Sequence, residues 1–231
     1  FVKASGYNMA HIEPNGYTGL NLDPLKKLRI LPELSDLDMV NELKTHFLDA
    51  HAAIPSIETL VHVFIPHKFV DHTHADAILA LSNQVDGEKL LRNALGDAVA
   101  LLPYVPPGLK LAKAVADKLE QEPSAQAIVL MQHGLITWGE TAKQSYLKTI
   151  ELTGKAETYL KQNARNPLRP MISTSLAEAE KRYLALAPIV RGLLARATED
   201  PDHPWARTIL QPLISRDVLD FVDSDRGKEL P

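Results

Sequence analysis

The chain has 231 residues, with 25 basic and 29 acidic side chains and a formal charge of −4 at neutral pH. Its 45% apolar and 23% charged residues are average for a globular protein, which excludes a disordered, collagen-like or coiled-coil chain. The length fits one large domain, or a domain with an extension. The mild negative charge offers no basic surface for nucleic acid, and no apolar run reaches the roughly 18 residues of a membrane span.

The chain contains no cysteine, which excludes disulfides, thiol nucleophiles, iron–sulfur clusters and thiolate zinc fingers. This absence, together with a start that lacks a secretory signal pattern, favours a cytoplasmic protein. The chain opens on Phe1 rather than Met and stops at Pro231 without an obvious terminus. We therefore expect a fragment of a longer polypeptide.

The hydrophobic pattern predicts strands that alternate with helices. A short strand followed by turns is expected in residues 1–25. Further strands are predicted at 69–73, 99–102, 127–131 and 135–138. Helices are predicted at 36–47, from 55 onwards, and at 75–81, 87–95, 110–119 and 140–162. Strands separated by helices predict a layered α/β architecture.

The pattern changes near residue 171. A helix is predicted over 175–197 with a kink or break at Pro188, followed by a proline-broken segment and a polar end. We therefore expect a main domain over 1–170 and a helical C-terminal extension over 171–231. Neither a GxGxxG motif nor a P-loop occurs, so no motif indicates nucleotide binding.

The sharpest candidate site begins with the alternating histidines of the strand at 69–73. Alternate residues of a strand point to the same face, so His72 and His74 could bind one ion together. A catalytic zinc commonly has three protein ligands and leaves its fourth position open for water or substrate, so a third ligand is required. His133 is the best candidate, because it lies beside Gly134 at a break in a buried strand, where backbone or substrate can approach closely.

Structural interpretations compete with this metal site. An isolated His-x-His pattern is weak evidence for a metal. Asp71 and Asp76 could orient the imidazoles, or could be solvated carboxylates at strand and helix ends. The remaining histidines are expected on the surface or in the core: His11, His46, His51, His62, His67 and His203.

Glu58 is expected in the first turn of a helix that Ser56 caps. A carboxylate there usually does no more than interact with the helix dipole, and His62 offers it a structural partner four residues later. The functional alternative rests on its position upstream of His72. A carboxylate near a metal can serve as a ligand or as a general base.

Small residues in turns form a candidate phosphate site. Turns and helix N-termini present N–H groups that suit a phosphate, although each such turn alone is ordinary. The residues concerned are Ser5, Gly6, Thr18, Gly19 and Ser56.

Three segments in this order, Pro55-Ser56-Ile57-Glu58, His72-Thr73-His74 and His133-Gly134, resemble the class II aldolase/adducin family. The resemblance covers about residues 1–160. The stretch PSIETLVHVFIPHKFVDHTHADAI is similar to the aldolase part of proteins that fuse a rhamnulose-1-phosphate aldolase to a short-chain dehydrogenase. The resemblance implies a three-layer α/β/α fold with a central sheet flanked by helices. It also implies that the extension leads to a dehydrogenase domain.

The resemblance further implies a set of site residues. His72, His74 and His133 would bind zinc or another divalent metal, and Glu58 would be the catalytic acid/base. Ser5, Gly6, Thr18, Gly19 and Ser56 would lie near the substrate phosphate. Two departures stand out: the loop of the family that reads SGN is Ser5-Gly6-Tyr7-Asn8 here, and Ile57 replaces the second serine of the PSSE pattern.

The activity implied is cleavage of a ketose 1-phosphate, rhamnulose 1-phosphate above all, to dihydroxyacetone phosphate and an aldehyde. A homo-oligomer, a tetramer by the resemblance, would act on this sugar phosphate without a nucleic-acid or membrane partner. Two alternatives remain. One is a pentulose-phosphate 4-epimerase, and the other is a non-catalytic interaction module of the adducin kind.

Overall fold

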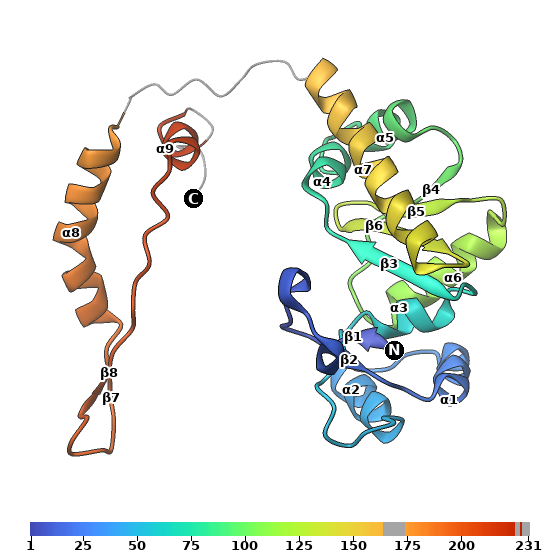
Figure 1. The fold of residues 1–231 in the computed structure, drawn as a ribbon, viewed down its shortest axis with the longest axis horizontal. Helices are drawn as coiled ribbons and strands as arrows, with labels where there is room; N and C mark the ends of the chain where they lie inside the picture. The colour runs from blue at the N-terminus through green and yellow to red at the C-terminus, as the bar shows by residue number, and fades with distance from the viewer. Residues whose placement is uncertain (164–173, 225–226, 228–231) are drawn as a thin grey trace. The chain divides into compact units, whose positions relative to one another are not determined.

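The computed structural model describes residues 1–163, 174–224 and 227 of the chain (Figure 1). The chain divides into two compact units, Phe1–Asn163 and Ala164–Pro231. The candidate site residues all lie in the first unit. The predicted boundary between residues 170 and 171 falls outside the described residues.

The first unit begins with a small layer of short elements. Strand β1 (Val2–Lys3) pairs antiparallel with β2 (Tyr17–Thr18). Three 3₁₀ helices and two α-helices belong to this region: η1 (Met9–His11), η2 (Pro14–Gly16), η3 (Leu28–Ile30), α1 (Leu22–Lys27) and α2 (Asp36–Thr45). Ser35 caps α2 by accepting a hydrogen bond from the Asp38 N–H, which satisfies one of the helix's unpaired donors.

A four-stranded mixed sheet forms the centre of the first unit, with strand order β3-β6-β5-β4. Its strands are β3 (Phe69–Thr73), β4 (Val99–Leu102), β5 (Ala127–Leu130) and β6 (Gly134–Gly139). Its helices are α3 (Thr59–Phe64), α4 (Asp76–Ser82), α5 (Gly87–Leu95), α6 (Leu109–Gln121) and α7 (Ala142–Asn163). Only β4 and β5 are parallel, and helix α6 connects them across one face of the sheet.

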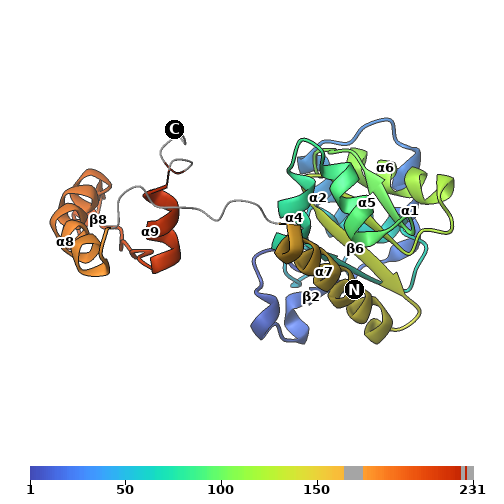
Figure 2. The ribbon, with the colours of Figure 1, turned by 90° about the horizontal axis from the view of Figure 1, so that it is seen from above.

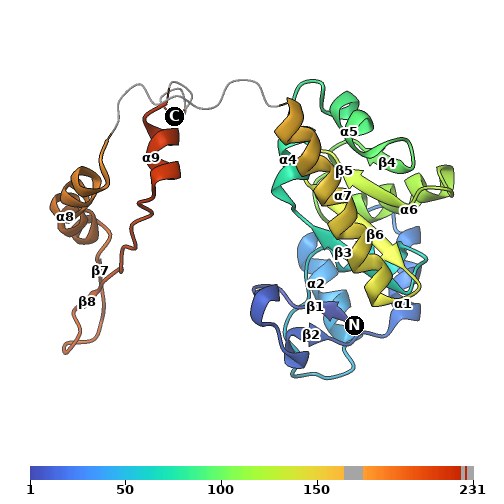
Figure 3. The same ribbon diagram turned by 45° about the horizontal axis from the view of Figure 1, so that its top comes forward.

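Helices cover both faces of the sheet, as Figure 2 and Figure 3 show from two further sides. Helices α3 and α6 pack on one face, where Leu102, Ile128 and Ile136 are buried. Helices α4, α5 and α7 pack on the other, where Leu101 and Val129 are buried. Neighbouring strand residues therefore face opposite cores, as the two-residue period requires. This arrangement confirms the predicted α/β/α layers.

Most predicted elements occur within a residue or two of their expected bounds. Strand 127–131 ends earlier, at Leu130, because the chain turns through Gln132, whose φ is 59°. The helix expected from residue 55 begins only at Thr59. The segment before it instead pairs with the first strand, since the Ser56 N–H donates to the Lys3 carbonyl. Glu58 is consequently the residue that precedes the helix, and not part of its first turn.

The second unit contains α8 (Leu176–Leu193), β7 (Arg196–Ala197), β8 (Trp205–Ala206) and α9 (Arg216–Val222). Of the kink or break predicted at Pro188, the break does not occur, because α8 runs through this residue and ends only at Leu193. The residues expected at the end of that helix pair as β7 with β8. No helix among the described residues of either unit is both long and apolar enough to cross a bilayer.

Candidate metal site

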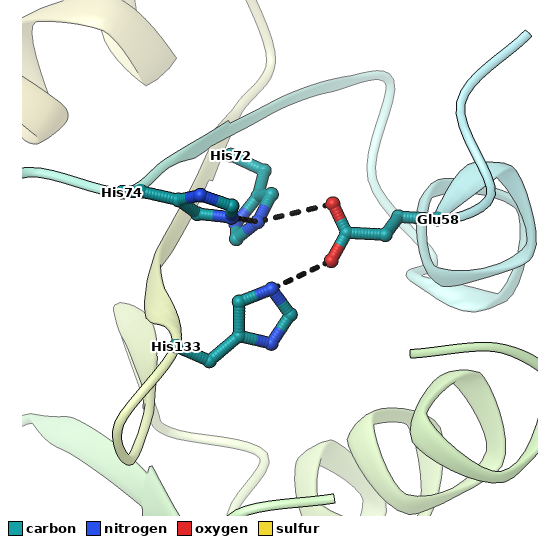
Figure 4. A group of neighbouring side chains, drawn as sticks. All are labelled: Glu58, His72, His74 and His133. Carbon is teal, nitrogen blue, oxygen red and sulfur yellow. Dashed lines mark hydrogen bonds and ion pairs between the residues drawn. The ribbon is translucent and has the colours of Figure 1, made fainter. Parts of the chain in front are cut away.

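Four side chains, Glu58, His72, His74 and His133, converge in the first unit, and Figure 4 shows them pointing toward one another. Each offers one ligand atom, and these atoms all lie within 4.8 Å of one another. The residues come from the start of α3, from β3 and the residue following it, and from the turn between β5 and β6. The structure thus brings together the three histidines and the glutamate that the sequence singled out.

Strand β3 and the residue that follows it direct His72 and His74 toward the site. The His72 Nδ1 atom lies 3.1 Å from the Leu135 carbonyl of β6, so it donates to that oxygen as Nδ1–H. This bond holds the ring so that its Nε2 atom turns toward the site. The Nε2 atoms of His72 and His74 lie 3.0 Å apart. Two imidazole nitrogens so close favour a shared cation or a single shared proton.

The Glu58 carboxylate contacts two of the imidazoles. Its Oε1 atom lies 2.7 Å from His133 Nε2, and its Oε2 atom lies 3.3 Å from His72 Nε2. Burial raises the pKa of Glu58, but its interactions with His133 and His72 outweigh burial and hold that pKa well below its usual range. Glu58 is therefore a carboxylate at neutral pH. The Glu58 N–H donates to the Ser56 hydroxyl at 3.2 Å, which fixes the backbone that carries the carboxylate.

Gly134 allows the turn that carries His133 to approach β3. A Cβ atom at this position would lie 2.5 Å from the Thr73 carbonyl oxygen and 3.0 Å from ring carbons of both His72 and His74. No side chain fits there without displacing the backbone of β3. The glycine beside His133 is thus required by the close approach that the sequence pattern predicted.

The donor set fits a divalent metal. The buried Glu58 Oε1 atom has the His133 Nε2 atom 2.7 Å away, so a carboxylate oxygen and imidazole nitrogens face one another as donors around a single cation would. Burial and the charges of His72 and His133 lower the pKa of His74, which keeps its imidazole neutral and able to coordinate. Nitrogen and carboxylate donors in this number are typical of zinc and related divalent ions.

A cavity of about 450 Å³ opens beside this cluster. Besides Glu58, His72 and His74, its lining includes the polar residues Lys3, Tyr17, Ser56, His62, Asp71 and Thr73. Asp71, one of the two carboxylates expected to flank the histidines, lies in this wall. The other, Asp76, is exposed in the first turn of α4.

The predicted phosphate residues separate into two groups. Ser56 lines the cavity, and the exposed Ser5 lies on the segment that pairs beside it. The backbone N–H groups of Ser5 and Ser56 donate to the carbonyls of Ile54 and Lys3, so they are not the N–H groups that would bind a phosphate. Gly6, which adopts a φ of 81°, follows Ser5 in an exposed turn.

Thr18 and Gly19 are both buried away from the cavity. The Thr18 hydroxyl donates to the Ala53 carbonyl, and a Cβ at Gly19 would lie 3.1 Å from side-chain atoms of Leu48 and Phe1. These two residues support the packing of β2. Neither lines the cavity, so we do not place the substrate phosphate beside them.

The sequence did not point to four polar residues of the cavity wall: Lys3, Tyr17, His62 and Thr73. His62 was expected on the surface or in the core, yet it lines the cavity. Burial and the nearby His72 lower its pKa to about 4, so it is neutral at neutral pH. Its spacing of four residues from Glu58 was the feature of the sequence that could have placed it near the site. Lys3 also lines the cavity. The only feature of the sequence that could have pointed to it is its position as a cationic residue just before the Ser5-Gly6 turn.

Comparisons with known proteins place similar sequences and folds in one family. The family described as Class II Aldolase and Adducin N-terminal domain matches residues 1–160. A protein of Bacillus subtilis (strain 168), named uncharacterized oxidoreductase YuxG, is 32% identical over the whole chain, and the chain spans 33% of its length. A solved N-terminal class II aldolase domain from Thermoplasma acidophilum is 37% identical, with a TM-score of 0.64 over 68% of this chain and 73% of that one.

A more distant solved structure shares the fold. It is YgbL of Klebsiella pneumoniae, described as a putative aldolase/epimerase/decarboxylase. It is 18% identical, with a TM-score of 0.50 over 78% of this chain and 79% of that one.

Proposed function

The chain belongs to the class II aldolase and adducin family, and from that premise we propose that it is a divalent-metal-dependent aldolase, a carbon–carbon lyase. Its substrate in this proposal is a ketose 1-phosphate, and rhamnulose 1-phosphate is the preferred candidate. The products are dihydroxyacetone phosphate and an aldehyde, which is lactaldehyde for that sugar. The observation that carries the proposal is the convergence of Glu58, His72, His74 and His133 beside a cavity.

In this proposal His72, His74 and His133 hold the metal, which is zinc by preference, with Glu58 next to it. A divalent metal bound there supplies Lewis-acid polarisation of the substrate's oxygens, which stabilises developing negative charge by several kcal/mol. Neutral imidazoles leave the full positive charge of the ion available for this purpose. The Leu135 carbonyl supports the arrangement by holding the ring of His72 in one tautomer.

Glu58 is the proposed acid/base. Cleavage breaks the bond between C3 and C4 of the ketose and leaves the electron pair on the three-carbon fragment. In the direction of aldol addition the Glu58 carboxylate removes a proton from C3 of dihydroxyacetone phosphate. In cleavage Glu58 first takes up a proton from water and then delivers it to C3, which completes dihydroxyacetone phosphate and restores the carboxylate. The C4 hydroxyl must lose its proton to a second group. The other titratable residues of the cavity wall besides the metal cluster are Lys3, Tyr17, His62 and Asp71.

The substrate phosphate in this proposal lies near Lys3 and Ser56, with the Ser5-Gly6 turn beside them. Lys3 brings an ammonium group to the cavity wall, where it donates to the Ala4 carbonyl at 3.0 Å. An ammonium has two further protons to donate, and a phosphate is a strong acceptor for them. Ser56 adds a hydroxyl on the same wall.

The relationship to the longer Bacillus protein supports one more element of the proposal. That relative carries the name of an oxidoreductase, and the chain corresponds to a third of its length. We therefore propose that the helical extension connects the aldolase unit to a dehydrogenase domain in such proteins.

The decisive experiment is a coupled assay of the metal-loaded chain with rhamnulose 1-phosphate, in which dihydroxyacetone phosphate is detected as it forms. Fuculose 1-phosphate and ribulose 5-phosphate serve as alternative substrates. Glu58→Gln should be inactive. Glu88→Gln, which alters an exposed first-turn carboxylate of α5, should match the wild type. If ribulose 5-phosphate is epimerised and no substrate is cleaved, the protein is an epimerase and not an aldolase. If it acts on none of the substrates, an interaction module is favoured.

A further inference from the structure

His133 differs from His72 in how its ring is held. The His72 ring is anchored through Nδ1 to the Leu135 carbonyl, as is usual for a metal-binding imidazole. The Nδ1 atom of His133 is buried and has no hydrogen-bond partner among the described residues. Apart from the contact of its Nε2 atom with Glu58, the orientation of the His133 ring therefore depends on the backbone that carries it.

That backbone adopts an uncommon conformation. Gln132, the residue immediately before His133, has a φ of 59° and is the only non-glycine residue in the described ranges with a positive φ. Its side chain is exposed, so the conformation does not serve the packing of that side chain. A non-glycine residue persists in this region only where its surroundings enforce it.

A buried serine of α4 helps to hold Gln132 in this backbone conformation. The Gln132 N–H donates to the Ser82 hydroxyl at 3.2 Å, and that hydroxyl lies 3.4 Å from the Leu79 carbonyl, to which it donates in turn. Ser82 is 1% exposed and ends α4. On the two sides of the turn, the N–H groups of Met131 and His133 donate to the carbonyls of Leu102 and Leu130.

We propose that Ser82 is a positioning residue for His133, which acts by holding the Gln132 peptide in its left-handed conformation. This inference rests on the proposed function, because it assigns His133 to the metal. Without the Ser82 hydroxyl, the part-buried Gln132 N–H would lose its protein acceptor and face a methyl group, and the turn would relax toward a negative φ. The His133 Nε2 atom would then leave the position at which it faces Glu58.

The test is a titration of the full chain with zinc in competition with a chromophoric chelator, repeated with cobalt to record the absorption bands of the bound ion. Ser82→Ala should bind zinc about 10- to 100-fold more weakly, the usual effect of removing a group that orients a ligand. Its cobalt bands should also shift. The control is Ser145→Ala, which removes an equally buried helix hydroxyl, 3.4 Å from the Thr137 carbonyl of β6 and away from the turn. It should bind zinc as the wild type does.

A second pair of variants tests the backbone without removing a buried group. Gln132→Val places a β-branched residue where a positive φ is most costly, and it should weaken zinc binding. Gln132→Gly permits the same φ without strain and should keep the wild-type affinity. Wild-type affinity in both Ser82→Ala and Gln132→Val would overturn the inference. A wild-type chain that binds no divalent metal would overturn the proposed function, and the inference with it.

Discussion

Glu58 Oε1 lies 2.7 Å from the Nε2 atom of His133, which joins the start of α3 to the turn between β5 and β6. The same carboxylate reaches His72 on β3 through its other oxygen. One side chain therefore connects the three segments that supply the candidate metal site.

Replacement of Glu58 by Gln should keep the metal and remove proton transfer. Three histidines remain as donors, whereas the amide cannot titrate. We expect the exchange of a carbon-bound proton of dihydroxyacetone phosphate with deuterated water to slow by about 10²- to 10⁴-fold, measured by NMR. The Glu88→Gln chain should exchange at the wild-type rate. Near wild-type exchange in metal-loaded Glu58→Gln would show that another group is the base.

Replacement of His133 by Ala should abolish stoichiometric metal binding while the fold persists. The variant removes one of three imidazole donors from a site that offers no cysteine as a substitute. Elemental analysis of dialysed protein measures the metal content, and circular dichroism checks the fold. His203→Ala, which alters an exposed histidine of the second unit, is the control and should retain the metal. Full occupancy in the His133 variant would remove this residue from the ligand set.

Gly134→Ala should destabilise the protein by about 1–3 kcal/mol, the range typical of overpacking. The added methyl group would lie 2.5 Å from the Thr73 carbonyl oxygen, so β3 and β6 must separate. Gly154→Ala offers a matched comparison, because a Cβ there meets no atom within 4 Å inside helix α7. It should stabilise the helix by roughly 0.5–1 kcal/mol. Urea denaturation of both variants measures the difference, and equal effects would contradict the close approach.

His62 should make the metal-free protein less stable in mild acid. Its pKa lies near 4 in the folded chain, against 6.5 ordinarily, so between these values the unfolded chain binds the proton more readily. Stability is therefore lost as the pH falls from about 6.5 to about 4, by up to about 3 kcal/mol. His62→Gln should lack this component. Denaturation at several pH values compares the two chains, and parallel pH profiles would show that His62 does not titrate with a depressed pKa.

A phosphorylated ketose should bind more tightly than the free ketose, and Lys3 should account for much of the difference. Calorimetric titration of both sugars measures this preference. Lys3→Gln should weaken binding of the phosphorylated sugar and leave the free sugar unaffected, because the ammonium contacts only the phosphate in our proposal. Lys110→Gln changes an exposed cation outside the cavity wall and serves as the control. Equal affinities for the two sugars in the wild type would refute the phosphate site.

Local patterns indicated the layered fold and the candidate histidines of this protein, and the family resemblance added the role of Glu58. Buried strands and amphipathic helices follow from hydrophobic periods of two and of about 3.6 residues, and each period is a property of neighbouring positions. The pairing of His72 with His74 on one strand face is local in the same way. The break at His133-Gly134 is likewise visible as an interruption of an apolar run.

Only the tertiary structure decided which of the small residues face the cavity. Ser56 lines the cavity, whereas the Thr18 hydroxyl donates a hydrogen bond to the Ala53 carbonyl away from it. Both are hydroxyl residues beside turns. The difference arises because residues 54–56 pair with the first strand, a contact that no periodicity specifies. Lys3 and His62 enter the cavity wall for the same reason. Hydrogen-bonded pairing between distant segments depends on how the whole chain packs, and that packing leaves no repeat in the sequence.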